Sequence, residues 1–307
     1  MLLVLCGSLD GSVDLVVHNS RTNIFRFNID LIDEYSVILE PHFWSIENPS
    51  GARIDSNIAT RAWWWKAFSF ALDKDPMYQE EVKYLFREIY AWFGHRELIV
   101  GNTPDFENRF GKIAQLEVAT RHLPTLPTSL RVNNPFPESL LKSAIAKPLT
   151  STMDAGGRVR QTTDVSGMDL DPAYPWLIQE LAHAKSDITV LVVGSRLYAY
   201  RRSRANLTGL DWRPEQFTSP EKWELTAVPE QYEVGIFNFM EDTKSDWGRI
   251  DFLEMPDEKW IFLEYNANGQ WGFLEQDCPI GLPEHVAEFL CLGPTKGFNN
   301  TRSPNKA

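Results

Sequence analysis

Apolar residues recur along the chain with both the helical and the strand period. The strongest helical pattern covers Met77–Phe93, whose apolar side chains recur at spacings of three and four before Gly94 ends the pattern. A second helix is predicted over Phe110–His122. Short apolar runs predict strands at Leu2–Cys6, Ile24–Asn28, Ser36–Leu39, Leu98–Val100, Thr128–Val132 and Ser143–Lys147.

The second half of the chain has the pattern of strand hairpins. The predicted strand pairs are Asp187–Val193 with Arg196–Arg201, and Trp247–Glu254 with Lys259–Tyr265. Short helices are expected at Glu138–Lys142 and Pro283–Leu290. The intervening stretch Leu149–Leu170 is rich in Ser, Thr, Gly, Asp and Arg, which predicts either a mobile loop or a hairpin whose tip moves.

The composition is that of a globular protein. The 307 residues suggest two or three domains, and 43% of them are hydrophobic and 23% charged. A formal net charge of −12 repels nucleic acid and anionic lipid, so neither is expected as a partner. Three widely spaced cysteines make neither a disulfide framework nor a four-ligand zinc site. With no apolar run long enough to span a membrane, these features predict a cytoplasmic protein.

Polar oxygens end two strands of the last predicted hairpin. Glu264 and Asn266 are two residues apart and share one face of their strand, and Asp251 lies on the strand paired with it. Two carboxylates and an amide oxygen form a hard, oxygen-only set, which suits magnesium rather than zinc. On spacing alone, the same three residues could equally be surface polar residues of an amphipathic hairpin.

The residues around these three resemble the magnesium signature of the ATP-grasp ligases, a strand ending in Asp followed by a strand ending in Glu-x-Asn and a glycine. The longer string Phe262–Trp271 resembles the graspetide, or microviridin-type, peptide macrocyclase branch, in which Gln-Trp follows that glycine. Other stretches are similar to this branch and occur in its order: Phe25–Asp30, Arg61–Lys66, Asn102-Thr-Pro, Asn108–Leu116, Thr125–Pro135 and Asp211-Trp-Arg213.

The resemblance implies an α/β (α+β) protein with the ATP-grasp fold. It predicts an N-terminal pre-ATP-grasp α/β domain over residues 1–123. A central, lid-bearing subdomain would cover residues 124–181, with a mobile loop at 149–170. A C-terminal antiparallel-sheet subdomain over residues 182–307 would carry the magnesium site.

The resemblance also assigns residues to ATP. Lys147 at a strand end and Lys112 early in its helix would contact the phosphates, a task that suits a point-charge ammonium. The backbone of Gln179-Glu180-Leu181 would receive adenine, and Asp187 would bond a ribose hydroxyl. The alternatives are a solvated lysine at positions 112 and 147 and a strand-start cap at position 187.

Three arginines are candidates for the substrate side of the site. Arg249 would stabilise negative charge in an acyl-phosphate or tetrahedral intermediate, or else form a structural pair with Asp251. Arg201 and Arg202 would bind a substrate carboxylate, and only one of the two can point inward. Thr189 stands where relatives often carry an arginine, so Arg201 or Arg202 would have to compensate for it.

The implied activity is that of an ATP- and Mg²⁺-dependent carboxylate ligase. Asp or Glu side chains of a ribosomally made precursor peptide would be activated as acyl-phosphates. Ser, Thr or Lys side chains of the same peptide would then capture them and close ester or amide macrocycles. The precursor leader would dock on the hairpin and basic residues between Asp187 and Arg213, and relatives commonly form homodimers. The alternatives are a ligase that adds free amino acids to a peptide or protein, and a non-catalytic nucleotide- or peptide-binding homologue.

Overall fold

The computed structural model describes residues 1–66, 75–102, 110–150, 161–216 and 218–292. Its N-terminal part is a parallel sheet in the order β2-β1-β6-β7, built from Leu2–Cys6 (β1), Ile24–Asn28 (β2), Arg61–Trp64 (β6) and Ile99–Val100 (β7). All five residues of β1 are buried, as expected for a parallel strand covered on both faces. The predicted strand Leu2–Cys6 is therefore confirmed.

Alternate residues of β1 face two different cores. Leu3 and Leu5 pack with α2 (Pro76–Gly94), while Val4 packs with α1 (Gly11–Asn19). The short elements η1 (Ile29–Glu34), β3 (Ser36–Glu40), β4 (Phe43–Glu47) and β5 (Arg53–Asp55) complete this part, with β3, β4 and β5 forming a separate antiparallel sheet.

A small antiparallel sheet lies in the middle of the chain, in the order β10-β9-β11-β8. Its elements are β8 (Thr128–Arg131), α5 (Glu138–Leu141), β9 (Ala144–Lys147), β10 (Thr163–Asp164) and β11 (Trp176–Glu180). Strand β10 pairs antiparallel with β9, and this pairing forms the base of a hairpin around the segment that follows Leu149. The predicted tip at Gly156-Gly157 lies outside the described residues.

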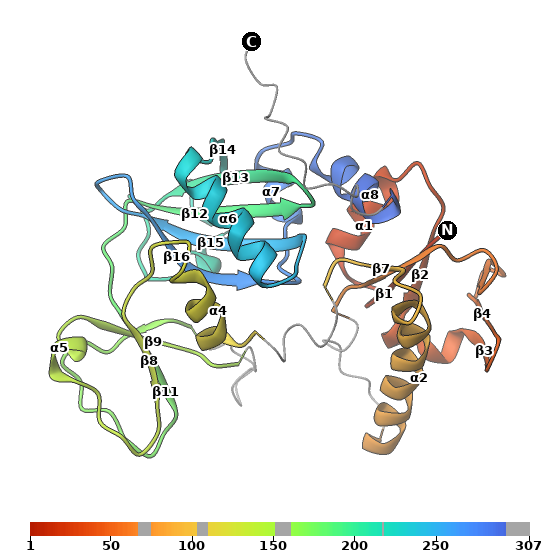
Figure 1. The fold of residues 1–307 in the computed structure, drawn as a ribbon, viewed down its shortest axis with the longest axis horizontal. Helices are drawn as coiled ribbons and strands as arrows, with labels where there is room; N and C mark the ends of the chain where they lie inside the picture. Colours follow the sequence, from red (N-terminus) through yellow and green to blue (C-terminus); the bar gives the residue numbers. More distant parts are fainter. Residues whose placement is uncertain (67–74, 103–109, 151–160, 217, 293–307) are drawn as a thin grey trace, which may run out of the picture.

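The largest sheet is antiparallel, in the order β14-β13-β12-β15-β16, and occupies the upper left of Figure 1. Its elements are β12 (Ser186–Val193), β13 (Arg196–Ser203), η2 (Arg213–Glu215), β14 (Glu224–Thr226), β15 (Trp247–Glu254) and β16 (Trp260–Asn266). Helices α4 (Lys112–Ala119) and α6 (Glu230–Asp242) cover one face, with Val118, Ile236 and Phe239 packed on the sheet. Both predicted hairpins are confirmed.

The other face of this sheet joins the N-terminal part through one core. Leu191 and Trp247 of the sheet lie in the same cluster as Trp63 and Trp65 of the N-terminal part, together with α7 (Gly272–Asp277) and α8 (Leu282–Leu292). Asn102 adds a buried polar link, because its Nδ2 donates to the carbonyls of Trp247 and Ala267, both at 2.7 Å. The N-terminal part thus supports the strands that carry the predicted metal ligands.

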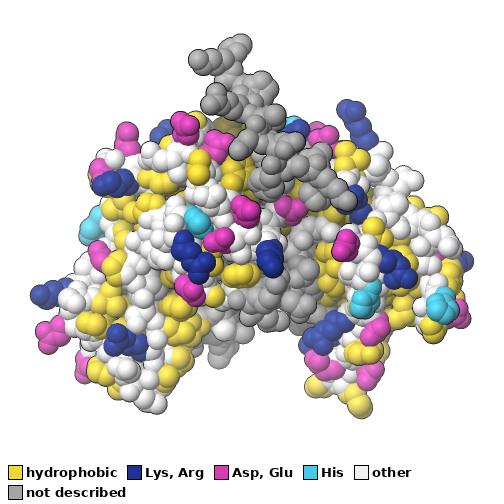
Figure 2. Space-filling view, in the orientation of Figure 1, with side chains coloured by type: hydrophobic (Ala, Val, Ile, Leu, Met, Phe, Trp, Pro, Cys, Tyr) yellow, Lys and Arg dark blue, Asp and Glu magenta, His cyan; other side chains and the backbone are white. Residues whose placement is uncertain are grey.

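The mixed α/β fold class is confirmed, whereas three α-helices among the described residues, α1, α6 and α7, were not predicted. Helix α1 is only nine residues long, and α6 contains Gly235, which weakens a helical pattern. The predicted helix over Phe110–His122 is shorter, running from Lys112 to Ala119. No helix among the described residues is long and apolar enough to cross a membrane. Acidic and basic side chains are interspersed on the face shown in Figure 2.

We expect Gly235→Ala to destabilise the protein by about 1–3 kcal/mol. A Cβ atom at this position would lie 2.6 Å from the His122 carbonyl oxygen and 2.7 Å from Leu123 Cδ2, so α6 would have to move off the segment that follows α4. Urea unfolding measures the change. Gly11→Ala is the matched control, since its Cβ would meet nothing within 4 Å. Equal stability of the two variants would contradict this packing.

Candidate ATP and metal site

Strand register places the three candidate metal ligands side by side. Asp251 pairs with Glu264 of β16 on one side and with Thr189 of β12 on the other. Asn266 pairs with Arg249, two residues from Asp251. The ladder shifts between Asp251 and Phe252, so the carboxylates lie at a bulge, a feature often found beside active sites.

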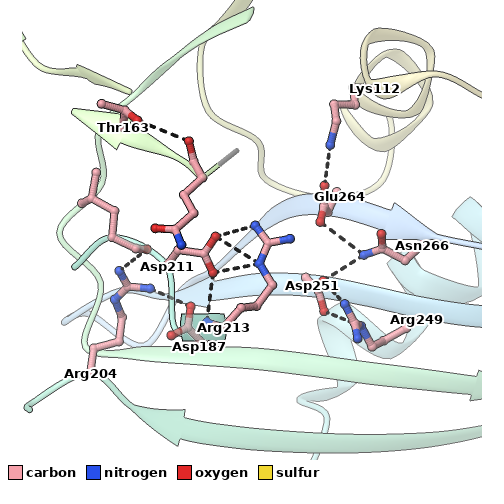
Figure 3. A network of polar contacts seen from close by, with 12 residues as sticks. Lys112, Thr163, Asp187, Arg204, Asp211, Arg213, Arg249, Asp251, Glu264 and Asn266 are labelled. Atoms are coloured by element: carbon pink, nitrogen blue, oxygen red, sulfur yellow. Dashed lines mark hydrogen bonds and ion pairs between the residues drawn. The ribbon is translucent and has the colours of Figure 1, made fainter. Parts of the chain in front are cut away.

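Asp251 is held from three directions. Thr189 Oγ1 donates to its Oδ1 at 2.7 Å, and Asn266 Nδ2 donates to its Oδ2 at 2.9 Å. Arg249 donates from Nε to Oδ1 at 3.1 Å and from Nη2 to Oδ2 at 3.0 Å. This two-pronged guanidinium contact fixes the plane of the carboxylate. Figure 3 shows Arg249, Asp251, Asn266, Glu264 and Lys112 in one continuous series of contacts.

Glu264 lies between two lysines that come from different parts of the chain. Its Oε2 accepts a hydrogen bond from Lys112 Nζ at 2.9 Å. Burial opposes ionisation of this carboxyl, but Lys112 and Lys147 overcome the effect and lower its pKa to about 2. Glu264 is therefore an anion throughout the physiological pH range.

Lys147 sits at the end of β9 and faces the same carboxylates. Burial lowers the pKa of its ammonium, Glu264 opposes that shift, and Lys112 reinforces it. Two lysines and two carboxylates thus meet where the central sheet, α4 and the large sheet come together. Such a group offers cationic contacts for phosphate beside oxygen ligands for a metal.

The donor set fits magnesium. Asn266 Nδ2 lies 2.9 Å from Asp251 Oδ2 and 3.3 Å from Glu264 Oε1, so the amide stands between the two carboxylates. Rotation of that amide would present Oδ1 in place of Nδ2 and bring three oxygens together. Within the described residues, no group of three or more His, Cys, Asp or Glu side chains is placed to hold a metal. The candidate set is therefore two carboxylates and one amide, an oxygen-only set suited to Mg²⁺.

Asp187 lies farther along β12 and is buried. Arg204 Nη1 donates to its Oδ1 at 2.6 Å, while its Oδ2 has no hydrogen-bond partner among the described residues. Burial raises the pKa of Asp187 to about 6, although Arg204 acts in the opposite direction. A buried oxygen without a partner is a suitable acceptor for a ligand hydroxyl, which fits the ribose contact expected for this residue.

Asp187 should make stability fall as the pH rises from about 4 to about 6. In that interval the folded protein holds a proton on Asp187 that the unfolded chain has released, so the rise in pH lowers the stability of the folded state by about 3 kcal/mol in total. Asp187→Asn should remove this part of the pH dependence, as measured by urea unfolding at pH 4 and pH 7. The exposed residue Asp169 provides a control, Asp169→Asn. An unaltered difference between the two pH values in Asp187→Asn would contradict the assignment.

The two candidate substrate arginines lie on opposite faces of β13. Arg202 pairs with Asp187, is 2% exposed and lies over the Trp212 ring at 5.6 Å, with no hydrogen-bond partner for its Nη1 among the described residues. Arg201 pairs with Ile188, is exposed and lines a separate cavity with Glu254. Only Arg202 therefore faces the side of the sheet that carries Asp251.

Arg213 lies near the candidate metal ligands, although the sequence did not predict it as a catalytic or binding residue. Its guanidinium donates hydrogen bonds to Asp211, and these raise the pKa of Arg213. The negative charges of Glu264 and Asp251 raise the pKa of Arg213 further. Figure 3 shows it between Asp211 and the candidate metal ligands. The similarity of Asp211-Trp-Arg213 to the graspetide branch was the available signal, but a residue in the short η2 turn has no strand period to indicate its direction.

No protein-family model and no curated protein matches the chain. Solved structures do. The macrocyclase MdnC of Microcystis aeruginosa MRC, bound with precursor peptide MdnA, matches with a TM-score of 0.79 and 22% identity, over 95% of this chain and 99% of that one. A RiPP-associated ATP-grasp ligase of Chryseobacterium gregarium, in complex with ADP and a leader and core peptide, gives 0.77 and 20%, over 94% and 96%. The chain has the fold of these ATP-grasp ligases.

A third ATP-grasp ligase extends the comparison. PsnB, complexed with a phosphomimetic variant of a minimal precursor, Mg and ADP, matches with a TM-score of 0.71 and 18% identity, over 95% of this chain and 97% of that one. The resemblance stated from the sequence is thus confirmed at the level of the fold.

In the predicted adenine-binding segment, the Glu180 carbonyl lies opposite the proline that precedes the neighbouring strand β8. The Glu180 amide donates to the Pro127 carbonyl at 2.9 Å, and the Leu181 amide donates to the Ser143 carbonyl at 3.0 Å. Pro127, opposite Glu180, has no N–H with which to complete the reciprocal bond to the Glu180 carbonyl. That carbonyl is suited to accept a hydrogen bond from an amino group. The side chain of Gln179 instead points inward and bonds Thr128 at 2.9 Å.

Thr189 has a specific contact in place of the expected arginine. It binds Asp251 Oδ1, the same oxygen that Arg249 Nε contacts. A guanidinium therefore still lies next to this position, but it comes from β15 rather than from β12. Arg249 is closer to the carboxylates than the predicted substitutes Arg201 and Arg202, because it bonds Asp251 directly.

Proposed function

We propose that this protein is an ATP-dependent ligase that closes macrocycles in a ribosomally made precursor peptide. The observation that carries the proposal is the meeting of Asp251, Glu264 and Asn266 with Lys112 and Lys147 on an ATP-grasp fold. Cations for a triphosphate and oxygens for Mg²⁺ stand together, which is the arrangement that phosphoryl transfer requires.

Each residue has a part in this chemistry. Asp251, Glu264 and Asn266 would hold Mg²⁺, which would neutralise phosphate charge. Lys112 and Lys147 bind the phosphates of ATP while a substrate carboxylate attacks the γ-phosphorus and ADP leaves. Arg202, Arg213 and Arg249 hold the carboxylate and the acyl-phosphate in place. A hydroxyl or amine of the same peptide then attacks the acyl carbon, loses its proton and releases phosphate.

The mass of the product tests the proposal. The full chain is incubated with ATP, Mg²⁺ and a candidate precursor peptide that carries Asp or Glu together with Ser, Thr or Lys side chains, and the peptide mass is measured. Loss of one water for each bond formed, with release of ADP, is the expected result. A gain equal to an added amino acid would support the alternative ligase. An unchanged peptide without ADP release would support a non-catalytic binding protein.

We propose that the precursor leader docks at the hairpin of β12 and β13 and the basic residues that follow it. A cavity of about 560 Å³ lies there, lined by Arg201 and Arg204 together with Lys185, Lys222 and three glutamates. A surface with both signs of charge suits a peptide that carries both acidic and basic side chains.

Arg201→Glu should weaken leader binding by about tenfold, because it reverses an exposed charge in this cavity. Fluorescence anisotropy with a labelled leader peptide measures the affinity. Arg53→Glu reverses an exposed charge in β5 of the small antiparallel sheet β3-β4-β5 and should leave the affinity unaltered. Equal affinities of both variants and the wild type would reject this docking position.

Two further features belong to the proposal. We propose that the protein acts in the cytoplasm, in keeping with its three free cysteines. We also propose that it is a homodimer, because members of the family that it resembles commonly form homodimers. Light scattering coupled to size-exclusion chromatography measures the mass in solution, and a monomer mass at micromolar concentration would contradict the dimer.

A further inference from the structure

The loop after β16 connects the candidate site to the N-terminal part of the protein. Arg249, which orients Asp251, uses its remaining Nη1 to donate to the Gln270 carbonyl at 2.6 Å. The side chain of the same glutamine extends the other way, and its Nε2 donates to Asp10 Oδ2 at 2.9 Å. Its Oε1 accepts a hydrogen bond from Ser12 Oγ.

Asp10 is a rigid anchor. It is 5% exposed and caps α1, with Oδ1 accepting from the amides of Ser12 at 3.0 Å and Val13 at 3.1 Å. Because Oδ1 is occupied by the helix, Oδ2 is the oxygen that can serve Gln270. Each polar atom of the Gln270 amide therefore has a partner at the N-terminal end of α1, either the cap Asp10 or Ser12, and the direction of each hydrogen bond is fixed.

The backbone on both sides of Gln270 leaves little freedom to shift. A Cβ atom at Gly269 would lie 2.9 Å from Asn266 Cβ and 3.0 Å from Arg249 Cβ, so the loop passes directly against two site residues. Trp271, on the other side, is fully buried in the core shared with the N-terminal part. A displacement of Gln270 would consequently move the carbonyl that holds Arg249.

We propose that Gln270 is a positioning residue, through which the cap of α1 sets the orientation of Arg249 and hence of Asp251. The bridge consists of Asp10, Gln270 and Arg249 and connects two parts of the chain about 260 positions apart, as the hydrogen bond between Asp10 and Gln270 shows. Gln270 acts through Arg249 and contacts neither metal nor phosphate. This inference rests on the proposed function for its effect on turnover.

A charge-complementation experiment tests the bridge. Gln270→Glu places a second carboxylate against Asp10 Oδ2 and should displace the loop. In the double variant Asp10→Asn/Gln270→Glu, the asparagine oxygen can still cap α1 while its Nδ2 donates to the new carboxylate, which restores the bridge with reversed polarity. Gln231→Glu on α6, also an exposed glutamine, adds the same charge away from the site.

We expect Gln270→Glu to lower kcat for precursor-dependent ADP formation at least tenfold with a smaller change in KM for ATP, and to weaken binding of Mg²⁺ with the analogue AMPPNP. The double variant should recover both to within threefold of wild type, and Gln231→Glu should match wild type. Wild-type-like behaviour of Gln270→Glu, or a double variant no better than the single one, would overturn the inference. If the wild type forms no ADP, the proposed function fails and AMPPNP affinity across the four proteins still decides the role of Gln270.

Discussion

Glu264→Gln should lower the rate of precursor-dependent ADP formation by about a hundredfold or more. The substitution keeps the size of the side chain but removes the charge that Lys112 and Lys147 hold ionised, with a pKa of about 2. It also removes one anionic ligand from a set that has only two carboxylates. ADP release with saturating precursor measures the effect, and AMPPNP binding with and without Mg²⁺ separates loss of metal from loss of fold.

Glu233→Gln is the matched control. Glu233 is an exposed residue of α6, the helix that covers the opposite face of the large sheet. It should keep wild-type turnover and wild-type dependence on Mg²⁺. Turnover of Glu264→Gln within threefold of the control would show that Glu264 is not a metal ligand.

Lys147→Met should lower kcat/KM for ATP by about ten- to a hundredfold, mainly through KM. Methionine keeps most of the apolar stem and removes the ammonium, which lies at the strand end that faces Glu264. Because burial lowers the pKa of Lys147, wild-type activity should also decline at a lower pH than an exposed lysine would require. Steady-state kinetics over a pH series measures both effects.

Lys142→Met tests whether the loss is specific. Lys142 is exposed and follows α5 in the same central sheet region, and the lysines that lower the pKa of Glu264 are Lys112 and Lys147. It should leave KM for ATP unaltered. If both variants raise KM equally, the effect belongs to net charge and not to a phosphate contact at Lys147.

Part of the placement of the candidate metal ligands could be predicted from the sequence, because it depends on local rules. A hairpin with a short turn fixes which residues of β15 and β16 are neighbours, and a period of two fixes their face. Glu264 and Asn266 follow the period of two, whereas Asp251 lies opposite Glu264 because the bulge between Asp251 and Phe252 shifts the register by one residue. Apolar runs and the turns between them also predicted β12, β13, β15 and β16, whereas β14, which has three residues, was not predicted.

Long-range contacts could not be predicted in this way. Lys112 meets Glu264 across 152 positions, and only the packing of α4 on the large sheet brings them together. The choice between Arg201 and Arg202 depends on the register of β13, which a one-residue shift would reverse. The bridge from Asp10 to Gln270 depends on how the N-terminal part meets the C-terminal sheet, so no local pattern contains it.

A crystal structure of the protein with Mg²⁺ and AMPPNP tests the central claim most directly. We expect one Mg²⁺ bound by oxygens of Asp251, Glu264 and Asn266 and by the nucleotide phosphates, with Lys112 and Lys147 on the phosphate side. A nucleotide bound elsewhere, or bound here with no ion between the two carboxylates, would contradict it.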